Sequence, residues 1–139
     1  MIVVDANVAL LWTIDDPHSR IALKLLRFES HLIAPDLIIP ELTNAFHRYG
    51  NQFPDRWDRL RDGMEFLPRW FSELVPSPLL RMRAFELALE LQYSAYDCYY
   101  LALALARDVK IVTADAHFVR EIDKSVYAGQ GLYLADWQP

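Results

Sequence analysis

Four acidic residues, Asp5, Glu41, Asp97 and Asp115, are the side chains of this chain best suited to chemistry. Each lies where a strand is predicted to end or a helix to begin. Four carboxylates gathered at one edge of a sheet would repel one another unless a cation joined them. Carboxylate oxygens are the ligands that Mg²⁺ and Mn²⁺ prefer. The pattern therefore points to a metal-assisted reaction on a phosphodiester.

Each of these acids, taken alone, also has an ordinary structural interpretation. Asp5 could close a strand-to-helix turn, and Asp115 could cap the helix that follows it. Asp97 stands three residues after Ser94, which is the spacing of a capping box. Glu41 could offset the dipole of its helix. Their joint placement favours a shared site, because a parallel sheet brings the carboxyl ends of its strands to the edge where ligands bind.

The elements that must position these side chains alternate between short apolar strands and longer helices. Strands are predicted over residues 2–5, 31–34, 73–75, 110–113 and 132–134. Helices are predicted over residues 16–28, 36–49, 55–70, 79–91, 95–107 and 116–123. This alternation implies a parallel sheet covered on both faces. The predicted fold class is α/β, a three-layer α/β/α domain with a central, mostly parallel sheet of four or five short strands.

The sequence also predicts where one helix begins and ends and which helical residues are buried. Asp36 is predicted to be the N-cap of the second helix, and Gly50, with the residue after it, to end that helix. The helical periodicity places Phe28 on one helix face with Ile21 and Leu25, and it predicts that Phe85 and Leu89 face the core.

Composition limits the class of protein. The chain has 139 residues, 53% of them hydrophobic, which favours one domain over residues 1–139 and argues against disorder. The apolar run at residues 99–106 is far shorter than the ~18 residues of a membrane span, so no membrane association is expected. The N-terminus lacks a basic flank and is interpreted as a strand, not a signal peptide. The lone Cys98 cannot form an internal disulfide, which favours a reducing cytoplasm.

The net charge of −5 provides no global basic footprint for nucleic acid. The acids of the predicted site are part of that sum, and a bound metal would offset them. Arginines are dense over residues 48–69, where acidic residues are interleaved with them. That segment is interpreted as a solvated helix face with ion pairs, or alternatively as a track for a phosphate backbone.

Other reactive side chains have weaker support. The four histidines form no paired ligand pattern, so a zinc site is not expected. Cys98 has no readable histidine partner and is expected to be packed in the interior. Packing is also the main role expected of the tryptophans and of the tyrosines near Asp97, with one or two of the tyrosines lining the pocket; these residues are Trp12, Trp57, Trp70, Trp137, Tyr93, Tyr96, Tyr99 and Tyr100.

Four segments of the chain resemble the motifs of the PIN domain and, more narrowly, of the VapC toxins of toxin–antitoxin pairs. In chain order they are residues 3–7, 40–45, 96–104 and 113–118. The resemblance implies a PIN fold and an endoribonuclease that depends on Mg²⁺, for which Mn²⁺ may substitute. It further implies an RNA substrate, a cognate VapB-like antitoxin, pairing of two copies, and in-line attack by water that leaves a 5′-phosphate and a 3′-hydroxyl.

The resemblance also implies roles for particular residues. The four acids named above would bind the metal and act in catalysis, with Asp5 and Asp97 as the main ligands. Asn7 and Thr113 match polar positions near the metal. Asn44 lies one helical turn after Glu41 and could support it, or serve as a buried or capping amide.

Several alternatives remain beside this interpretation. The chain could be a catalytically inactive PIN scaffold, or an RNA-processing PIN nuclease outside any toxin–antitoxin pair. Cys98, as the only cysteine, argues against a processing nuclease with a cysteine-rich zinc module. A haloacid-dehalogenase-like phosphatase would require an aspartate at the position of Asn7, which argues against that class.

Overall fold

The computed structural model describes residues 1–139. Its strands are β1 (Ile2–Val4), β2 (Leu32–Pro35), β3 (Glu73–Val75), β4 (Ile111–Thr113) and β5 (Gly131–Tyr133). Its helices are α1 (Ala6–Leu10), α2 (Ser19–Phe28), α3 (Ile38–Gln52), α4 (Trp57–Phe66), α5 (Arg81–Leu91), α6 (Ala95–Arg107) and α7 (Ala116–Asp123). Short 3₁₀ turns flank α4 and precede α5. The predicted alternation of strands and helices is confirmed.

The five strands form one sheet in the order β3-β2-β1-β4-β5, and every neighbouring pair is parallel. After β1, the chain builds the sheet on one side through β2 and β3, and then returns to add β4 and β5 on the other side of β1. The strand order therefore reverses between β1 and β4. Loops that leave two such strands diverge and open a crevice at their carboxyl ends, which is where ligands bind in sheets of this kind.

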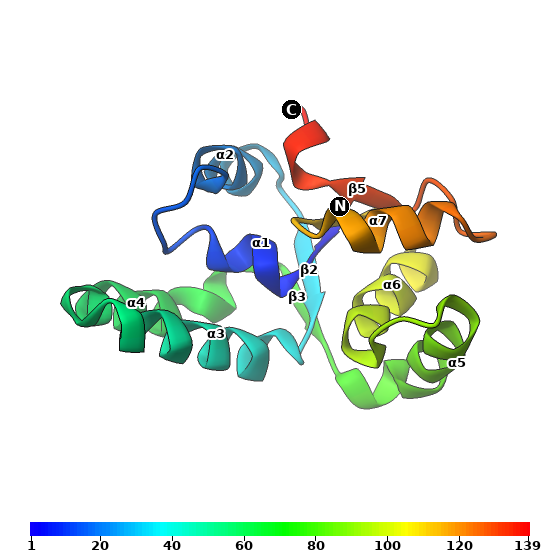
Figure 1. Cartoon of the computed structure of the whole chain (residues 1–139), viewed down its shortest axis with the longest axis horizontal. Helices are drawn as coiled ribbons and strands as arrows, with labels where there is room; N and C mark the ends of the chain where they lie inside the picture. Colours follow the sequence, from blue (N-terminus) through cyan, green and yellow to red (C-terminus); the bar gives the residue numbers. More distant parts are fainter.

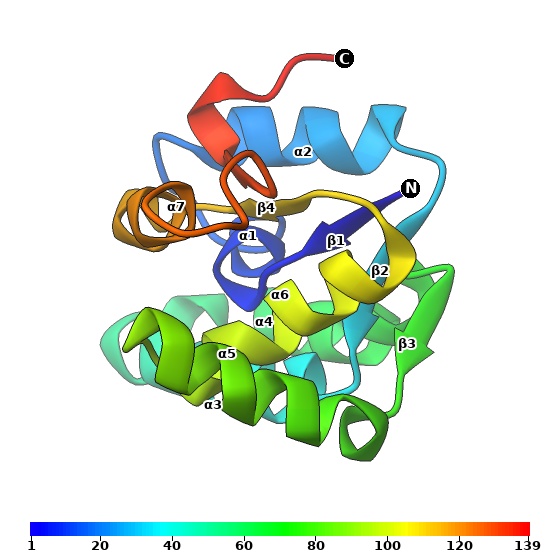
Figure 2. The same cartoon turned by 90° about the vertical axis from the view of Figure 1, so that its right-hand side faces the viewer.

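Helices cover both faces of the sheet, which confirms the predicted three-layer fold. Figure 1 shows α3 and α4 on one side of the strands, and α5 and α6 on the other. Helix α6 packs against β1, β2 and β4, and Figure 2 shows it crossing in front of the sheet with α5 beside it. Six of the 13 residues of α6 are buried, as expected for a helix enclosed between a sheet and a second helix. No helix has both the length and the hydropathy needed to cross a lipid bilayer.

Several predicted ends of helices and strands are wrong, and the first of them is at Gly50. The predicted end of the second helix at Gly50 does not occur, because α3 continues to Gln52. The indole N–H of Trp57 donates a 2.7 Å hydrogen bond to the carbonyl of Gly50, and a Cβ on this glycine would lie 3.3 Å from the Trp57 ring. Gly50 therefore allows α3 and α4 to approach closely and does not terminate a helix.

The predicted N-cap role of Asp36 is also wrong. The N-cap position of α3 is Leu37, and no side chain caps that helix. Asp36 instead accepts a 2.9 Å hydrogen bond from the backbone N–H of Ser77 and a second one from its hydroxyl. This carboxylate ties the end of β2 to the segment after β3, because the two strands are parallel neighbours.

The first strand ends one residue earlier than predicted, and α1 was not predicted at all. Asp5 follows β1 directly and occupies the N-cap position of α1, although its side chain makes no capping hydrogen bond. With only five residues, α1 is too short for a periodic hydrophobic pattern to reveal it.

The prediction that Phe85 and Leu89 face the core is wrong, because each is 56% exposed. The core face of α5 is formed by Ala84, Leu87 and Leu91. Because α5 carries apolar residues on two of its faces, periodicity alone does not distinguish the inner stripe from the outer one. The outer stripe remains on the surface.

Candidate active site

Asp5 lies at the carboxyl end of β1 and is almost completely buried, with an exposed fraction of 2%. Its Oδ2 atom accepts a 2.8 Å hydrogen bond from the hydroxyl of Thr113 and a 3.1 Å hydrogen bond from the amide of Asn7. Thr113 is the last residue of β4, which pairs with β1. The register of two neighbouring parallel strands therefore places the hydroxyl beside the carboxylate.

Asn7 connects Asp5 to the turn that follows β4. Its Oδ1 atom accepts a 2.9 Å hydrogen bond from the backbone N–H of Ala114. The N–H of Asp115 donates in turn to the Thr113 hydroxyl at 3.1 Å. The ends of β1 and β4 are thus joined by a continuous polar network that fixes the direction in which Asp115 leaves the sheet.

Asp115 is the N-cap of α7. Its Oδ1 atom accepts hydrogen bonds from the backbone N–H groups of His117 and Phe118 at 3.0 and 3.3 Å. Its Oδ2 atom accepts a 2.7 Å hydrogen bond from the hydroxyl of Tyr93. Asp115 is therefore a helix cap, as one interpretation predicted, and its negative charge also acts on Asp97.

Glu41 enters the pocket from the first turn of α3. Its Oε1 atom accepts a 2.9 Å hydrogen bond from the hydroxyl of Tyr100, which lies fully buried on α6. Burial raises the pKa of Glu41, the Tyr100 hydrogen bond lowers it in part, and the charge of Asp97 raises it further. Burial and the neighbouring carboxylates also raise the pKa of Tyr100, so its hydroxyl keeps the proton that it donates.

Asp97 lies half-buried in the first turn of α6. Burial, followed by the negative charge of Asp115, raises its pKa to about 6, and the Ser94 hydroxyl lowers it in part. Ser94 occupies the predicted N-cap position, but its side chain makes no capping hydrogen bond to the helix backbone.

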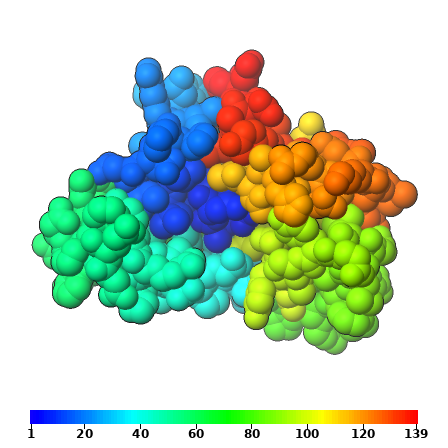
Figure 3. All heavy atoms as spheres, viewed as in Figure 1, coloured from blue at the N-terminus to red at the C-terminus, as the bar shows by residue number.

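The four acids share one electrostatic environment. Burial, followed by the charges of Asp97 and Glu41, raises the pKa of Asp5 to about 7, and the Thr113 hydroxyl lowers it in part. None of the four acids takes part in an ion pair. The pocket therefore concentrates negative charge that no arginine or lysine of the chain offsets. Figure 3 shows the dark-blue N-terminal segment in the recess between the surface of α3 and that of α5 and α6.

The donor set fits a hydrated hard cation. No three histidine, cysteine, aspartate or glutamate side chains lie close enough together to form a ready-made cage for an ion. Mg²⁺ does not require such a cage, because it keeps several waters and binds through one or two carboxylates. A zinc site would require at least three close protein ligands, chiefly histidine nitrogen or cysteine sulfur. The carboxylates of the pocket, which no cation of the chain offsets, therefore suit Mg²⁺ better than zinc.

Several other residues considered in the sequence analysis form no side-chain hydrogen bond or ion pair with the four acids. Asn44 is exposed and its side chain makes no hydrogen bond, so it does not support Glu41. Cys98 is fully buried, as predicted, and burial raises the pKa of its thiol to about 12. Arg56 and Arg59 form ion pairs with Asp15, in line with a solvated and paired helix face.

Tyr93 and Tyr100 are the polar residues of the site that sequence analysis did not single out. Both were grouped with residues expected mainly to pack. Tyr100 lies three residues after Asp97 on the same helix, and side chains at that spacing are neighbours on one helix face. That spacing was a usable signal for Tyr100. Tyr93 reaches Asp115 only through the fold, and no local pattern reveals this contact.

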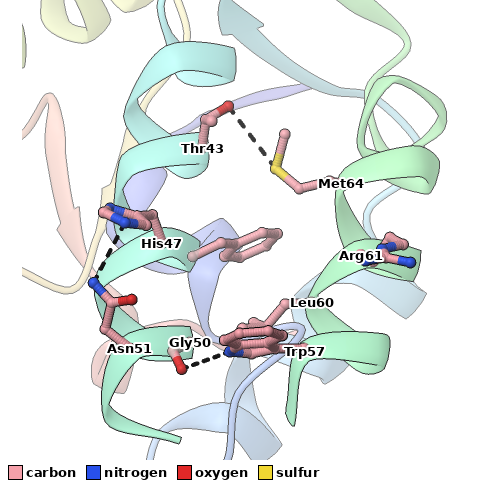
Figure 4. Close-up of a pocket in the computed structure, with 9 residues that line it drawn as sticks. Thr43, His47, Gly50, Asn51, Trp57, Leu60, Arg61 and Met64 are labelled. Atoms are coloured by element: carbon pink, nitrogen blue, oxygen red, sulfur yellow. Dashed lines mark hydrogen bonds between the residues drawn. The ribbon is translucent and has the colours of Figure 1, made fainter. Parts of the chain in front are cut away.

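A separate hollow of about 290 Å³ lies between α3 and α4 (Figure 4). Phe46, Leu60 and Met64 contribute its apolar lining, and His47 and Arg61 lie among its polar residues. None of the four acids lines this hollow, so it is distinct from the acidic pocket.

The sequence of the chain is similar to that of known proteins of one family. The family model described as the PIN domain matches residues 2–124. The chain is 36% identical over 120 residues to VapC ribonuclease Mb0985 of Mycobacterium bovis, covering 83% of this chain and 86% of that protein. It has the same identity and coverage with Ribonuclease VapC9 of Mycobacterium tuberculosis.

Proposed function

Because the chain belongs to the PIN-domain family, we propose that it is a metal-dependent endoribonuclease, the toxin of a type II toxin–antitoxin pair. One observation carries the proposal: the buried Asp5 and three further acids meet at the β1/β4 switch point without any cation of the chain to offset them. The names of the relatives, VapC ribonuclease and Ribonuclease VapC9, support RNA as the substrate.

Asp5 and Asp97 would hold the cation, with Glu41 and Asp115 bound to its waters. Mg²⁺ is the proposed ion, with Mn²⁺ as a substitute, because both prefer oxygen ligands. A divalent cation supplies an activated water, neutralises the phosphate and stabilises the leaving oxygen.

Side chains of the pocket would accept the proton of the attacking water and keep the acids in place. The Tyr100 hydrogen bond holds Oε1 of Glu41, which leaves Oε2 free to accept a proton from the attacking water. The raised pKa of Glu41 suits this role as general base. Asp115 is held at both oxygens by protein donors and therefore keeps one orientation. In-line attack by water would leave a 5′-phosphate and a 3′-hydroxyl.

The proposal includes protein partners. A basic side chain of a VapB-like antitoxin would close the acidic pocket, and the net charge of −5 supports such a partner. Pairing of two copies is also proposed, supported by the exposed apolar side chains of Leu79 and Met82, which are 75% and 59% exposed. A cytoplasmic location is supported by the unpaired Cys98. A single continuous hydrophobic core supports one domain over residues 1–139.

The test is cleavage of total cellular RNA by the purified protein in Mg²⁺, in Mn²⁺ and in EDTA, with the new ends mapped. Asp5→Asn is the test variant. Asp58→Asn is the matched control, because Asp58 is exposed and forms no ion pair. Discrete metal-dependent cuts in wild type and Asp58→Asn, absent from Asp5→Asn, would support the proposal. Identical patterns from all three proteins would overturn it and favour the inactive scaffold.

A further inference from the structure

A hollow of about 620 Å³ opens beside Asp97, between α5, the turn that joins α5 to α6, and the start of α7. In Figure 3 the yellow-green surface of α5 and the orange surface of α7 lie next to each other on the right of the view. We propose that this hollow binds the nucleobase next to the scissile phosphate. We call it the base pocket, and six of its lining residues carry the proposal: Phe85, Leu89, Gln92, Tyr93, Asp97 and His117. The inference rests on the proposed ribonuclease function.

The lining of the base pocket includes apolar and aromatic side chains that are not buried in the hydrophobic core. Phe85 and Leu89 lie on the outer stripe of α5, and each is 56% exposed. The ring of Tyr93 stacks on Phe118 with centroids 4.8 Å apart and an interplanar angle of 17°, so its orientation is fixed. Aromatic faces of this kind bind bases by stacking, whatever the base.

His117 adds a second ring beside Tyr93. The two ring centroids are 5.4 Å apart and the rings are tilted by 54°. The His117 side chain is 60% exposed, and its Nε2 atom lies 3.5 Å from a carboxylate oxygen of Glu121. His117 is thus a lining residue of the base pocket whose side chain stays largely accessible to a ligand.

The base pocket is continuous with the acidic pocket. Asp97 lines the hollow and also acts electrostatically on Asp5. Tyr93 lines the hollow with its ring, while its hydroxyl holds Asp115 at 2.7 Å. A phosphate bound at the acids is covalently joined to a nucleoside on each side. One of these nucleosides can therefore place its base in the hollow without leaving the site.

Gln92 can bind the edge of that base. It ends α5 in the left-handed conformation, with φ of 50°. Its Nε2 atom donates a 2.8 Å hydrogen bond to the carbonyl of Leu89, which orients the amide and leaves Oε1 as an acceptor. That oxygen can accept a hydrogen bond from an N–H group of the base.

The experiment uses short RNAs that carry 2-aminopurine, whose fluorescence is quenched by stacking, and measures binding in Ca²⁺, which offsets the carboxylates of the acidic pocket. Gel electrophoresis checks that the probe stays uncut. The test variants are Phe85→Ala and Leu89→Ala, both at exposed positions. The matched control is Phe28→Ala, because Phe28 is an aromatic residue of 58% exposure on α2, outside the base pocket. Base preference at the cut sites is mapped in Mg²⁺ for the same proteins, and size-exclusion chromatography with light scattering records their oligomeric state.

Wild type and Phe28→Ala are expected to quench the probe equally. Phe85→Ala should bind about 5- to 100-fold more weakly, the range that corresponds to loss of one stacked base, and should lose base preference next to the cut. Unchanged binding and preference in both test variants would overturn the inference. Conversion of a dimer to monomers without a change in base preference would also overturn it and assign the surface to a second copy. A wild-type protein that binds the probe but cuts no RNA would refute the proposed function and leave base binding intact.

Discussion

The hydroxyl of Tyr100 on α6 donates a 2.9 Å hydrogen bond to Oε1 of Glu41 on α3, although the two residues are 59 positions apart. These helices lie on opposite faces of the sheet (Figure 1). The bond therefore crosses the β1/β4 edge and joins the two outer layers directly at the acidic pocket. Tyr93 holds Asp115 in a similar way, by a hydrogen bond that links the turn before α6 to the start of α7. Tyr93 and Tyr100 thus act as positioning residues for two of the four acids.

Removal of the Tyr100 hydroxyl tests this positioning role. Tyr100→Phe keeps the packed ring but frees Oε1 of Glu41, and we expect a loss of about 10- to 100-fold in Mn²⁺ affinity or cleavage rate, the range found for residues that orient metal ligands. Tyr99→Phe is the control, because Tyr99 lies on the same helix and its hydroxyl makes no hydrogen bond. A lower melting temperature with unchanged Mn²⁺ affinity and cleavage would show that Tyr100 has only a structural role.

The stability of the metal-free protein should depend on pH. Folding raises the pKa of Asp5 from 3.8 to about 7 and that of Asp97 from 3.8 to about 6. The folded state therefore binds more protons than the unfolded state. This contribution to stability is fully present below about pH 4 and is lost as pH rises through about 6 to 7. Glu73 and Glu121 have lowered pKa values, but they are exposed and have little effect.

Thermal melts in EDTA between pH 4.5 and 8 measure this dependence. The melting temperature is expected to fall as pH rises across that range, and added Mg²⁺ should reverse the fall at pH 7.5 by offsetting the carboxylates. A melting temperature that stays level or rises from pH 4.5 to 7 in EDTA would show that the acids are not crowded as described.

Neutralisation of Asp97 should stabilise the metal-free protein. Asp97→Asn removes one of the crowded charges, and after allowance for solvent screening we expect a gain of about 1 kcal/mol, or a rise of about 3–5 °C in Tm at pH 7.5 in EDTA. The same change should abolish cleavage. Asp58→Asn should leave the Tm within about 1 °C. A clear drop in Tm for Asp97→Asn would favour the interpretation of Asp97 as a capping residue.

Sequence patterns predicted the sheet and the positions of Asp5 and Asp115 at its edge for a common physical reason. The local sequence pattern predicts that Asp5 and Asp115 follow the ends of strands. Parallel pairing of those strands then brings both residues to one edge of the sheet. The same strand register places the hydroxyl of Thr113 beside the carboxylate of Asp5. Asp97 was found because a helix of buried residues begins beside it.

The features that sequence analysis missed depend on packing between distant elements. Gly50 reads as a helix terminator, but the approach of Trp57 requires it inside α3. Phe85 and Leu89 have the spacing of core residues, but a second apolar stripe on α5 occupies the core. Tyr93 reaches Asp115 only because α7 folds back beside the turn before α6.

Direct titration of Mn²⁺, followed by electron paramagnetic resonance at pH 7.5, is the measurement that tests most directly whether the acids at the β1/β4 edge form a cation site. Wild type and Asp58→Asn are expected to bind Mn²⁺ saturably and to release it to Mg²⁺. Asp5→Asn should bind at least about tenfold more weakly. Equal binding by Asp5→Asn and wild type would contradict the claim that this edge is the metal centre of the enzyme.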